Sequence, residues 1–135
     1  MKYMLDTNIC IYAIKKKPAE LFIKLQQCDP EDICISSVTY AELMHGVEKS
    51  SAPEKNRLAL TLLLANIDIL DFGSLAAEEY GKIRADLENQ GTPIGPLDTM
   101  IAGHARSCGC TVVTNNTREF CRVAGLKVED WTTAI

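Results

Sequence analysis

The stretch Tyr3-Met4-Leu5-Asp6-Thr7-Asn8 joins a short apolar segment to an acid that follows it directly. Short runs rich in apolar and β-branched residues recur along the chain and predict further strands. We therefore expect one strand at Tyr3-Met4-Leu5 and others at Ile33-Cys34-Ile35, Ile67-Asp68-Ile69-Leu70, Thr111-Val112-Val113 and, more weakly, Lys127-Val128.

Apolar residues at helical spacing lie between these strands. The predicted helices are Pro18–Cys28, Val38–Val47, Glu54–Asn66, Leu75–Glu88 and Met100–Ser107. Strands that alternate with helices favour parallel β-α-β units. The sequence thus predicts an α/β fold, a three-layer α/β/α arrangement with a mostly parallel sheet of about five strands. We expect a single domain over residues 1–135.

Composition narrows the classes of protein. Of 135 residues 47% are hydrophobic, and no basic segment leading into an apolar one marks export. The longest apolar stretch, Leu58–Leu70, is interrupted by Thr61, Asn66 and Asp68, so it lacks the roughly 18 consecutive apolar residues of a membrane span. We expect a cytoplasmic protein without a membrane segment. A net charge of −4 argues against coating nucleic acid by bulk electrostatics.

Six cysteines raise the question of disulfides or zinc. In a reducing cytosol free thiols are expected. Cys108-Gly109-Cys110 has neither the ligand spacing nor the second ligand pair of a zinc site. We predict that the cysteines pack as small apolar side chains.

Polar side chains, most of them acids, follow the predicted strands. In open α/β sheets, ligand-binding and catalytic residues lie outside the carboxyl ends of the strands. Asp6 follows the first strand, Glu42 lies early in the helix after the second, and Asp98 opens the helix before the fourth. The residues after the fourth strand include Asn115, Asn116 and Glu119. Four segments should therefore bring polar groups to one edge.

Each of these residues also has a purely structural interpretation. Thr39-Tyr40-Ala41-Glu42 and Asn116-Thr117-Arg118-Glu119 both resemble a capping box. Asp6 and Asp98 could each cap a helix or favour its dipole. Capping accounts for any one acid, but several carboxylates at one edge repel one another unless they are protonated or neutralised by a cation. A bound cation accounts for the set.

Clustered oxygen ligands without a thiolate or a tight histidine pair suit Mg²⁺, with Mn²⁺ as a substitute. Such an ion could activate water and hold a scissile phosphate, and two ions about 4 Å apart could share these tasks. The expected reaction is phosphodiester hydrolysis.

Taken in order, these segments resemble the VapC toxins of the PIN-domain ribonuclease family. They are Met4-Leu5-Asp6-Thr7-Asn8, Ile35-Ser36-Ser37-Val38-Thr39-Tyr40-Ala41-Glu42-Leu43, Gly95-Pro96-Leu97-Asp98-Thr99-Met100-Ile101-Ala102, Val113-Thr114-Asn115-Asn116-Thr117-Arg118-Glu119-Phe120 and Gly125-Leu126-Lys127-Val128-Glu129-Asp130-Trp131. The resemblance implies the toxin of a type II toxin–antitoxin pair, a magnesium-dependent endoribonuclease that cuts RNA, with transfer RNA the expected substrate, and inhibits translation.

The same motifs imply roles for individual residues. Asp6 and Asp98 would be direct metal ligands, and Glu42 would complete the catalytic carboxylates and orient water. Many PIN domains carry Asp where this chain has Asn116, which leaves the fourth acid open, with Glu119 as the candidate.

The resemblance also implies partners. They are a cognate VapB-type antitoxin, a second copy in a homodimer, and operator DNA reached only through the antitoxin. An arginine of the antitoxin would compete for the acidic pocket by charge. The apolar residues Leu58, Leu62 and Leu63 could serve the antitoxin or the dimer, or be ordinary core.

Other polar residues could support binding. Candidates for holding metal-bound water or phosphate at the strand ends are Thr7, Asn8, Ser36, Ser37, Thr114, Asn115 and Asn116. Candidates for phosphate contacts are Lys15-Lys16-Lys17, Arg84, Arg106 and Arg118, although the lysine run also fits a solvated helix end. His45 shares a helix face with Glu42, but we expect a surface or packing role for it, and a structural role for His104.

Three rival classes fit less well. A haloacid dehalogenase-type hydrolase needs a second Asp two residues after the first, where this chain has Asn8. A receiver domain needs an acidic doublet and a phosphoryl-accepting Asp, which Ile69-Leu70-Asp71-Phe72 matches poorly. A PIN-like fold that only binds an antitoxin would not need the intact acids.

Overall fold

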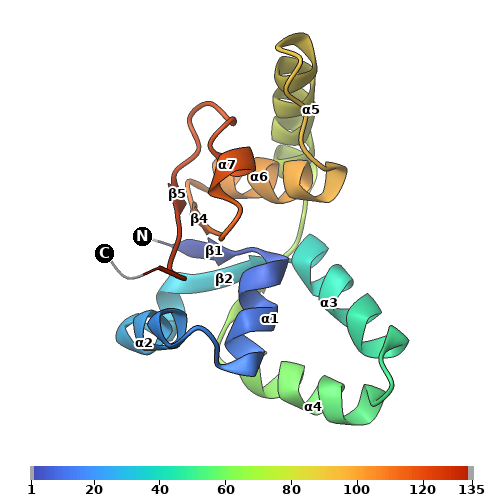
Figure 1. Ribbon diagram of the computed structural model, residues 1–135. Coiled ribbons are helices and arrows are strands. Elements are labelled where there is room, and N and C mark those ends of the chain that lie inside the picture. Colours follow the sequence, from blue (N-terminus) through green and yellow to red (C-terminus); the bar gives the residue numbers. More distant parts are fainter. Residues whose placement is uncertain (1, 134–135) are drawn as a thin grey trace.

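Parallel strands form the centre of the molecule, and helices cover both of their faces (Figure 1). The computed structural model describes residues 2–133, so positions 1, 134 and 135 of the predicted domain lie outside the described residues. The sheet has five strands in the order β3-β2-β1-β4-β5. They are β1 (Tyr3–Leu5), β2 (Ile33–Ser36), β3 (Asp68–Leu70), β4 (Thr111–Val113) and β5 (Val128–Glu129), and every pair is parallel.

Helices connect the strands and form the two outer layers, which confirms the predicted three-layer α/β fold (Figure 1). On one face lie α1 (Thr7–Lys15), α2 (Ala19–Gln27), α3 (Ser37–Lys49) and α4 (Pro53–Leu64). On the other lie α5 (Ser74–Asn89), α6 (Pro96–Cys108) and α7 (Thr117–Phe120). A short 3₁₀ helix, Pro30–Asp32, leads into β2.

Alternation along the strands builds two cores. Met4 and Val112 face α5 and α6, whereas their neighbours Leu5 and Val113 face α1 to α4. Successive side chains of a strand point to opposite faces of the sheet, so both faces must be apolar in a buried parallel sheet. β1 is the central strand of the sheet, and Asp6 lies directly at its carboxyl end.

Helix α1 was not among the helices predicted from the sequence. Its segment carries Ile9, Ile11 and Ile14, and β-branched residues two positions apart favour a strand locally. Asp6 caps the helix, and burial of Ile9, Cys10 and Ala13 against the sheet outweighs that preference. The chain therefore turns back at once after β1.

Helix α6 packs unusually closely on α5. A Cβ atom at Gly103 would lie 2.8 Å from the backbone nitrogen of Tyr80, so only glycine fits this crossing. The close approach fixes α6, the helix that carries Asp98, against α5.

The six cysteines are free thiols. Cys10, Cys34 and Cys110 are buried, as expected for packing residues, but Cys108 and Cys121 are exposed, so the packing prediction is wrong for these two. No helix within residues 2–133 is long and apolar enough to cross a membrane.

Candidate active site at the carboxyl edge of the sheet

Asp6 ends β1 and begins α1. Its carboxylate is buried, and Oδ1 accepts the N–H of Ile9 at 2.9 Å, so the capping interpretation is correct for this residue. Burial raises the pKa of Asp6, whereas hydrogen bonds from the Thr114 side chain and from Ile9 lower it, and the nearby charge of Glu42 raises it. Asp6 therefore both caps α1 and lies close to a second acid, Glu42.

Glu42 is half-buried on α3, and it accepts a hydrogen bond from Thr7 Oγ1 at 2.7 Å. The capping-box interpretation of Glu42 is wrong, because Ser36 rather than Thr39 caps α3 and accepts the N–H of Val38 at 3.1 Å. Glu42 thus lies inside the helix, where it satisfies no backbone group. Its contact with α1 gives it a fixed place beside Asp6.

Asp98 lies in the first turn of α6 and is half-buried. Its carboxylate accepts no hydrogen bond from any described residue, so it does not cap the helix. Burial raises the pKa of Asp98 to about 6, and the charges of Asp6, Glu119 and Glu42 add to the effect in that order. Asp98 is therefore the acid whose charge is least compensated by the protein itself.

Glu119 comes from α7, the fourth segment. Its Oε2 accepts a hydrogen bond from Asn116 Nδ2 at 2.8 Å, and the N–H of Asn116 is bound by Thr114 Oγ1 at 2.8 Å. Asn116 is the residue before α7 but makes no side-chain capping bond. The Asn116 amide thus holds Glu119 toward Asp98, whose pKa it raises.

The structure brings three of the six expected supporting residues to the acids. Thr7, Thr114 and Asn116 each contact an acid of the edge or a residue that does. Asn115 is exposed and donates instead to Tyr12 Oη at 3.2 Å. Asn8 and Arg118 are exposed, and their side chains make no hydrogen bond with the described residues.

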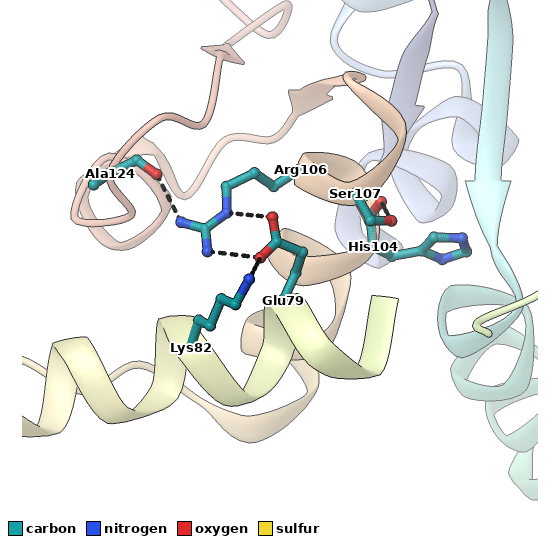
Figure 2. A network of polar contacts seen from close by, with 6 residues as sticks. All are labelled: Glu79, Lys82, His104, Arg106, Ser107 and Ala124. Atoms are coloured by element: carbon teal, nitrogen blue, oxygen red, sulfur yellow. Dashed lines mark hydrogen bonds and ion pairs between the residues drawn. The ribbon is translucent and has the colours of Figure 1, made fainter. Parts of the chain in front are cut away.

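Several of the basic candidates are engaged elsewhere. Arg106 binds both carboxylate oxygens of Glu79 at 3.3 and 3.2 Å and the carbonyl of Ala124 at 2.9 Å, and Lys82 joins the same network (Figure 2). Arg84 contacts Tyr80 and Glu88. Arg106 ties α6 to α5 and to the loop at Ala124, and the contacts of Arg84 lie within α5, so the predicted phosphate contacts of both arginines are disfavoured. The lysine run, Lys15 to Lys17, is exposed.

The remaining candidates have structural surroundings. His45 is exposed, as expected for a surface residue, and His104 is buried, as expected for a structural one. Ser36 is fully buried and bonded to Val38 and His104, so its hydroxyl is not available to a phosphate, whereas Ser37 is half-buried and accepts the N–H of Phe72 at 3.0 Å. Leu58 and Leu62 are 60% and 69% exposed, so the core interpretation is wrong for them.

Sequence reasoning missed one acid at this edge. Asp130 directly follows β5, and the β4–β5 register places it beside Thr114, which lies next to Asp6. Its charge raises the pKa of Asp6. The position directly after the weak fifth strand was the signal that could have identified it.

The acids at this edge have the chemistry of a metal site. Neighbouring carboxylate charges raise the pKa of Asp98 and of Asp6, and a hard divalent cation suits such a set because its charge relieves their repulsion. Over residues 2–133, no three acidic, histidine or cysteine side chains already converge on one metal position. Mg²⁺ commonly keeps several waters and uses only one or two carboxylates, so two of these acids suffice.

Known proteins of similar sequence are nucleases of one family. The PIN domain family matches residues 3–126. The chain is 53% identical to "tRNA(fMet)-specific endonuclease VapC" of Shigella flexneri over 131 residues, which is 97% of this chain and 98% of that relative. It is 47% identical to "Ribonuclease VapC2" of Haemophilus influenzae, again over 97% and 98% of the two chains.

Solved structures of VapBC complexes contain chains with the same fold. A chain of DNA-bound VapBC from Salmonella typhimurium has a TM-score of 0.91 at 48% identity, covering 97% of this chain and 98% of that one. A chain of VapBC2 from Rickettsia felis bound to a promoter fragment also has a TM-score of 0.91, at 42% identity over 97% and 99%. The protein therefore belongs to the PIN-domain family and, within it, to the VapC ribonucleases.

Proposed function

We propose that the chain is the toxin of a type II toxin–antitoxin pair, an endoribonuclease that acts in the cytoplasm, cleaves transfer RNA and so inhibits translation. The proposal rests on acids from four chain segments at one sheet edge of a VapC protein, because Asp6, Glu42 and Glu119 lie near enough to Asp98 for their charges to raise its pKa. The Shigella relative's name, tRNA(fMet)-specific endonuclease, supports initiator transfer RNA as the substrate.

In this proposal Asp6 and Asp98 hold Mg²⁺, with Mn²⁺ as a substitute. The bound ion supplies a Lewis acid for the scissile phosphate and lowers the pKa of water. Asp98 suits this task because its carboxylate accepts no hydrogen bond from the described residues and is held at a raised pKa. Asp6 keeps one oxygen on Ile9 and is thereby fixed in direction.

The other acids act on water and orientation. Glu42 is held by Thr7, so one of its oxygens is bound and the other remains to accept a proton or orient the attacking water. Glu119, fixed by Asn116, adds negative charge at the same edge. Among residues 2–133, no cysteine, serine or lysine at this edge is activated as a nucleophile, which favours direct attack by water.

The antitoxin partner is proposed from the VapBC neighbours and from the surface. A groove of about 260 Å³ lies between α1, α3 and α4, is lined mainly by apolar residues and includes Glu42 at its border. An antitoxin segment with an apolar side and an arginine would fill the groove and place its charge among the acids. Operator DNA would be reached through that antitoxin, and the toxin itself is proposed to pair with a second copy.

The test is cleavage of a tRNA(fMet) transcript by purified protein with Mg²⁺, with Mn²⁺, or with excess chelator. We expect defined cuts with either metal and none with chelator, and at least a hundredfold loss for Asp98→Asn, roughly the effect of removing a central electrostatic group. Glu78→Gln, an exposed acid on α5, is the matched control and should cleave normally. Equal cleavage in chelator would defeat the metal mechanism, and wild-type rates for Asp98→Asn would defeat the site.

A further inference from the structure

His104 is a buried histidine whose ring leaves α6 on the side opposite Glu79 (Figure 2). Its Nδ1 lies 2.8 Å from Oγ of Ser36, which is fully buried. The Ser36 oxygen already accepts the N–H of Val38, so its own hydrogen is free to bond to His104. Burial lowers the pKa of His104, which favours the neutral ring that can accept this hydrogen.

This bond joins the two elements that carry Glu42 and Asp98. Ser36 ends β2 and caps α3, and Glu42 lies six residues further along. His104 lies six residues beyond Asp98 on α6. At a helical rise of about 1.5 Å per residue, each acid therefore stands roughly 9 Å along its helix from the bond. Over residues 2–133, no other side-chain hydrogen bond links α6 to Ser36 or α3.

A third element fixes the ring itself. Phe72 packs edge-on against His104, with ring centroids 5.6 Å apart at 85°. The N–H of Phe72 in turn donates to Ser37 Oγ at 3.0 Å. The imidazole is thus held both by the ring of Phe72 and at its nitrogen, where β2, α3 and the segment before α5 meet.

We propose that His104 is a positioning residue that fixes Asp98 relative to Glu42. The proposal rests on the proposed function, because it concerns the same acids. Apolar packing alone lets helices slide by fractions of an ångström, whereas a buried hydrogen bond specifies one arrangement. Misplacement of catalytic groups by about 1 Å can cost roughly a hundredfold in rate.

Two substitutions separate the bond from the bulk of the ring. His104→Asn keeps a hydrogen-bonding atom near the place of Nδ1, whereas His104→Leu fills similar space and leaves the Ser36 hydroxyl unpaired. We expect His104→Leu to lower kcat on the tRNA(fMet) transcript by roughly tenfold to a hundredfold with little change in KM. His104→Asn should restore most of kcat. Titration of Mn²⁺ by the loss of its free-ion spin resonance signal should show weaker binding for His104→Leu alone.

Controls separate positioning from loss of stability. Leu21→Val, on α2, leaves a small cavity in the core on the other face of the sheet and serves as the stability control. Each variant is assayed at the same interval below its own melting temperature. Ser36→Ala removes the cap of α3 as well as the bond to His104, so it is also measured alone, and adding His104→Leu to it should cost little further kcat. Wild-type kcat for His104→Leu, an equal loss in Leu21→Val, or additive losses in the double variant would each overturn the proposal. Wild-type protein that neither cleaves RNA nor binds Mn²⁺ would instead overturn the proposed function.

Discussion

Thr7 donates its hydroxyl to Glu42 Oε1 at 2.7 Å, and this bond joins the first turn of α1 to α3. Thr7 directly follows Asp6, so the same turn that caps α1 also orients the second acid. A hydrogen bond to a charged partner contributes about 1.5–3 kcal/mol. The spacing between Asp6 and Glu42 is thus set by a neighbour of Asp6 rather than by packing alone.

Replacement of Thr7 by Val should therefore disturb catalysis more than folding. Thr7→Val preserves shape but leaves Glu42 without its donor, and we expect kcat to fall roughly tenfold, in line with the loss of one charged hydrogen bond. Thr7→Ser keeps the hydroxyl and should stay close to wild type. Steady-state cleavage of tRNA(fMet), with melting temperatures in parallel, makes the comparison. Equal rates for Val and Ser would show that the bond has no role in catalysis.

The raised pKa of Asp98 should make the metal-free protein less stable as pH rises. Because the folded pKa, about 6, lies above the ordinary value of 3.8, the native state binds more protons than the unfolded state between them. Stability then falls as pH rises from about 4 to 6 and stays lower above that range. The raised pKa of Asp6 acts in the same direction.

Asp98→Asn should remove this cost. In chelator at pH 7.5 we expect the variant to be more stable than wild type by on the order of 1 kcal/mol, after allowing for solvent screening of a half-exposed group. The difference should disappear near pH 4. Urea unfolding across this range measures it, with Glu78→Gln as the charge-matched control at an exposed position. A variant less stable than wild type at pH 7.5 would contradict the sign.

Asn116→Asp should convert a hydrogen bond into a repulsion. The Asn116 amide now donates to Glu119 at 2.8 Å, and a carboxylate in its place would face Glu119 with like charge. We expect a lower melting temperature in chelator but a larger rise when Mn²⁺ is added, because binding to the folded state alone stabilises it. Asn116→Ser, which removes the amide without adding charge, is the control. A rise in melting temperature no larger than that of wild type would separate Asn116 from the metal site.

Most of the fold followed from the strands. Each predicted strand is present within a residue or two, because short apolar runs between helices have few alternatives in a sheet buried on both faces. Helix α1 was missed because Ile9, Ile11 and Ile14 favour a strand locally, and only burial against the sheet reverses that preference. Local pattern therefore located the strands better than the first helix.

The candidate site was predictable by position but not by contact. In open α/β sheets, ligands bind outside the carboxyl ends of the strands, and this rule directed attention to Asp6, Glu42, Asp98 and Glu119. It could not tell that Asp6 caps a helix while Asp98 does not, since both precede or open a helix in the sequence. Pairings such as Ser36 with His104 join residues 68 positions apart, and nothing local specifies them.

The groove between α1, α3 and α4 can be closed without disturbing the helices that form it. Gly46 lies on α3 among its lining residues, and a Cβ atom there meets nothing within 4 Å. Gly46→Phe should fill the space that the antitoxin segment is proposed to occupy, whereas Gly46→Ala should only strengthen the helix, by about 1 kcal/mol. With a cognate VapB-type antitoxin as the probe, we expect Gly46→Phe to bind at least tenfold more weakly and Gly46→Ala to bind as wild type. Isothermal titration measures affinity, and cleavage of tRNA(fMet) by each free variant gives the reference.

Undiminished binding by Gly46→Phe would place the antitoxin elsewhere. A loss of cleavage without a loss of binding would assign the groove to RNA, because the added ring would then obstruct only the substrate.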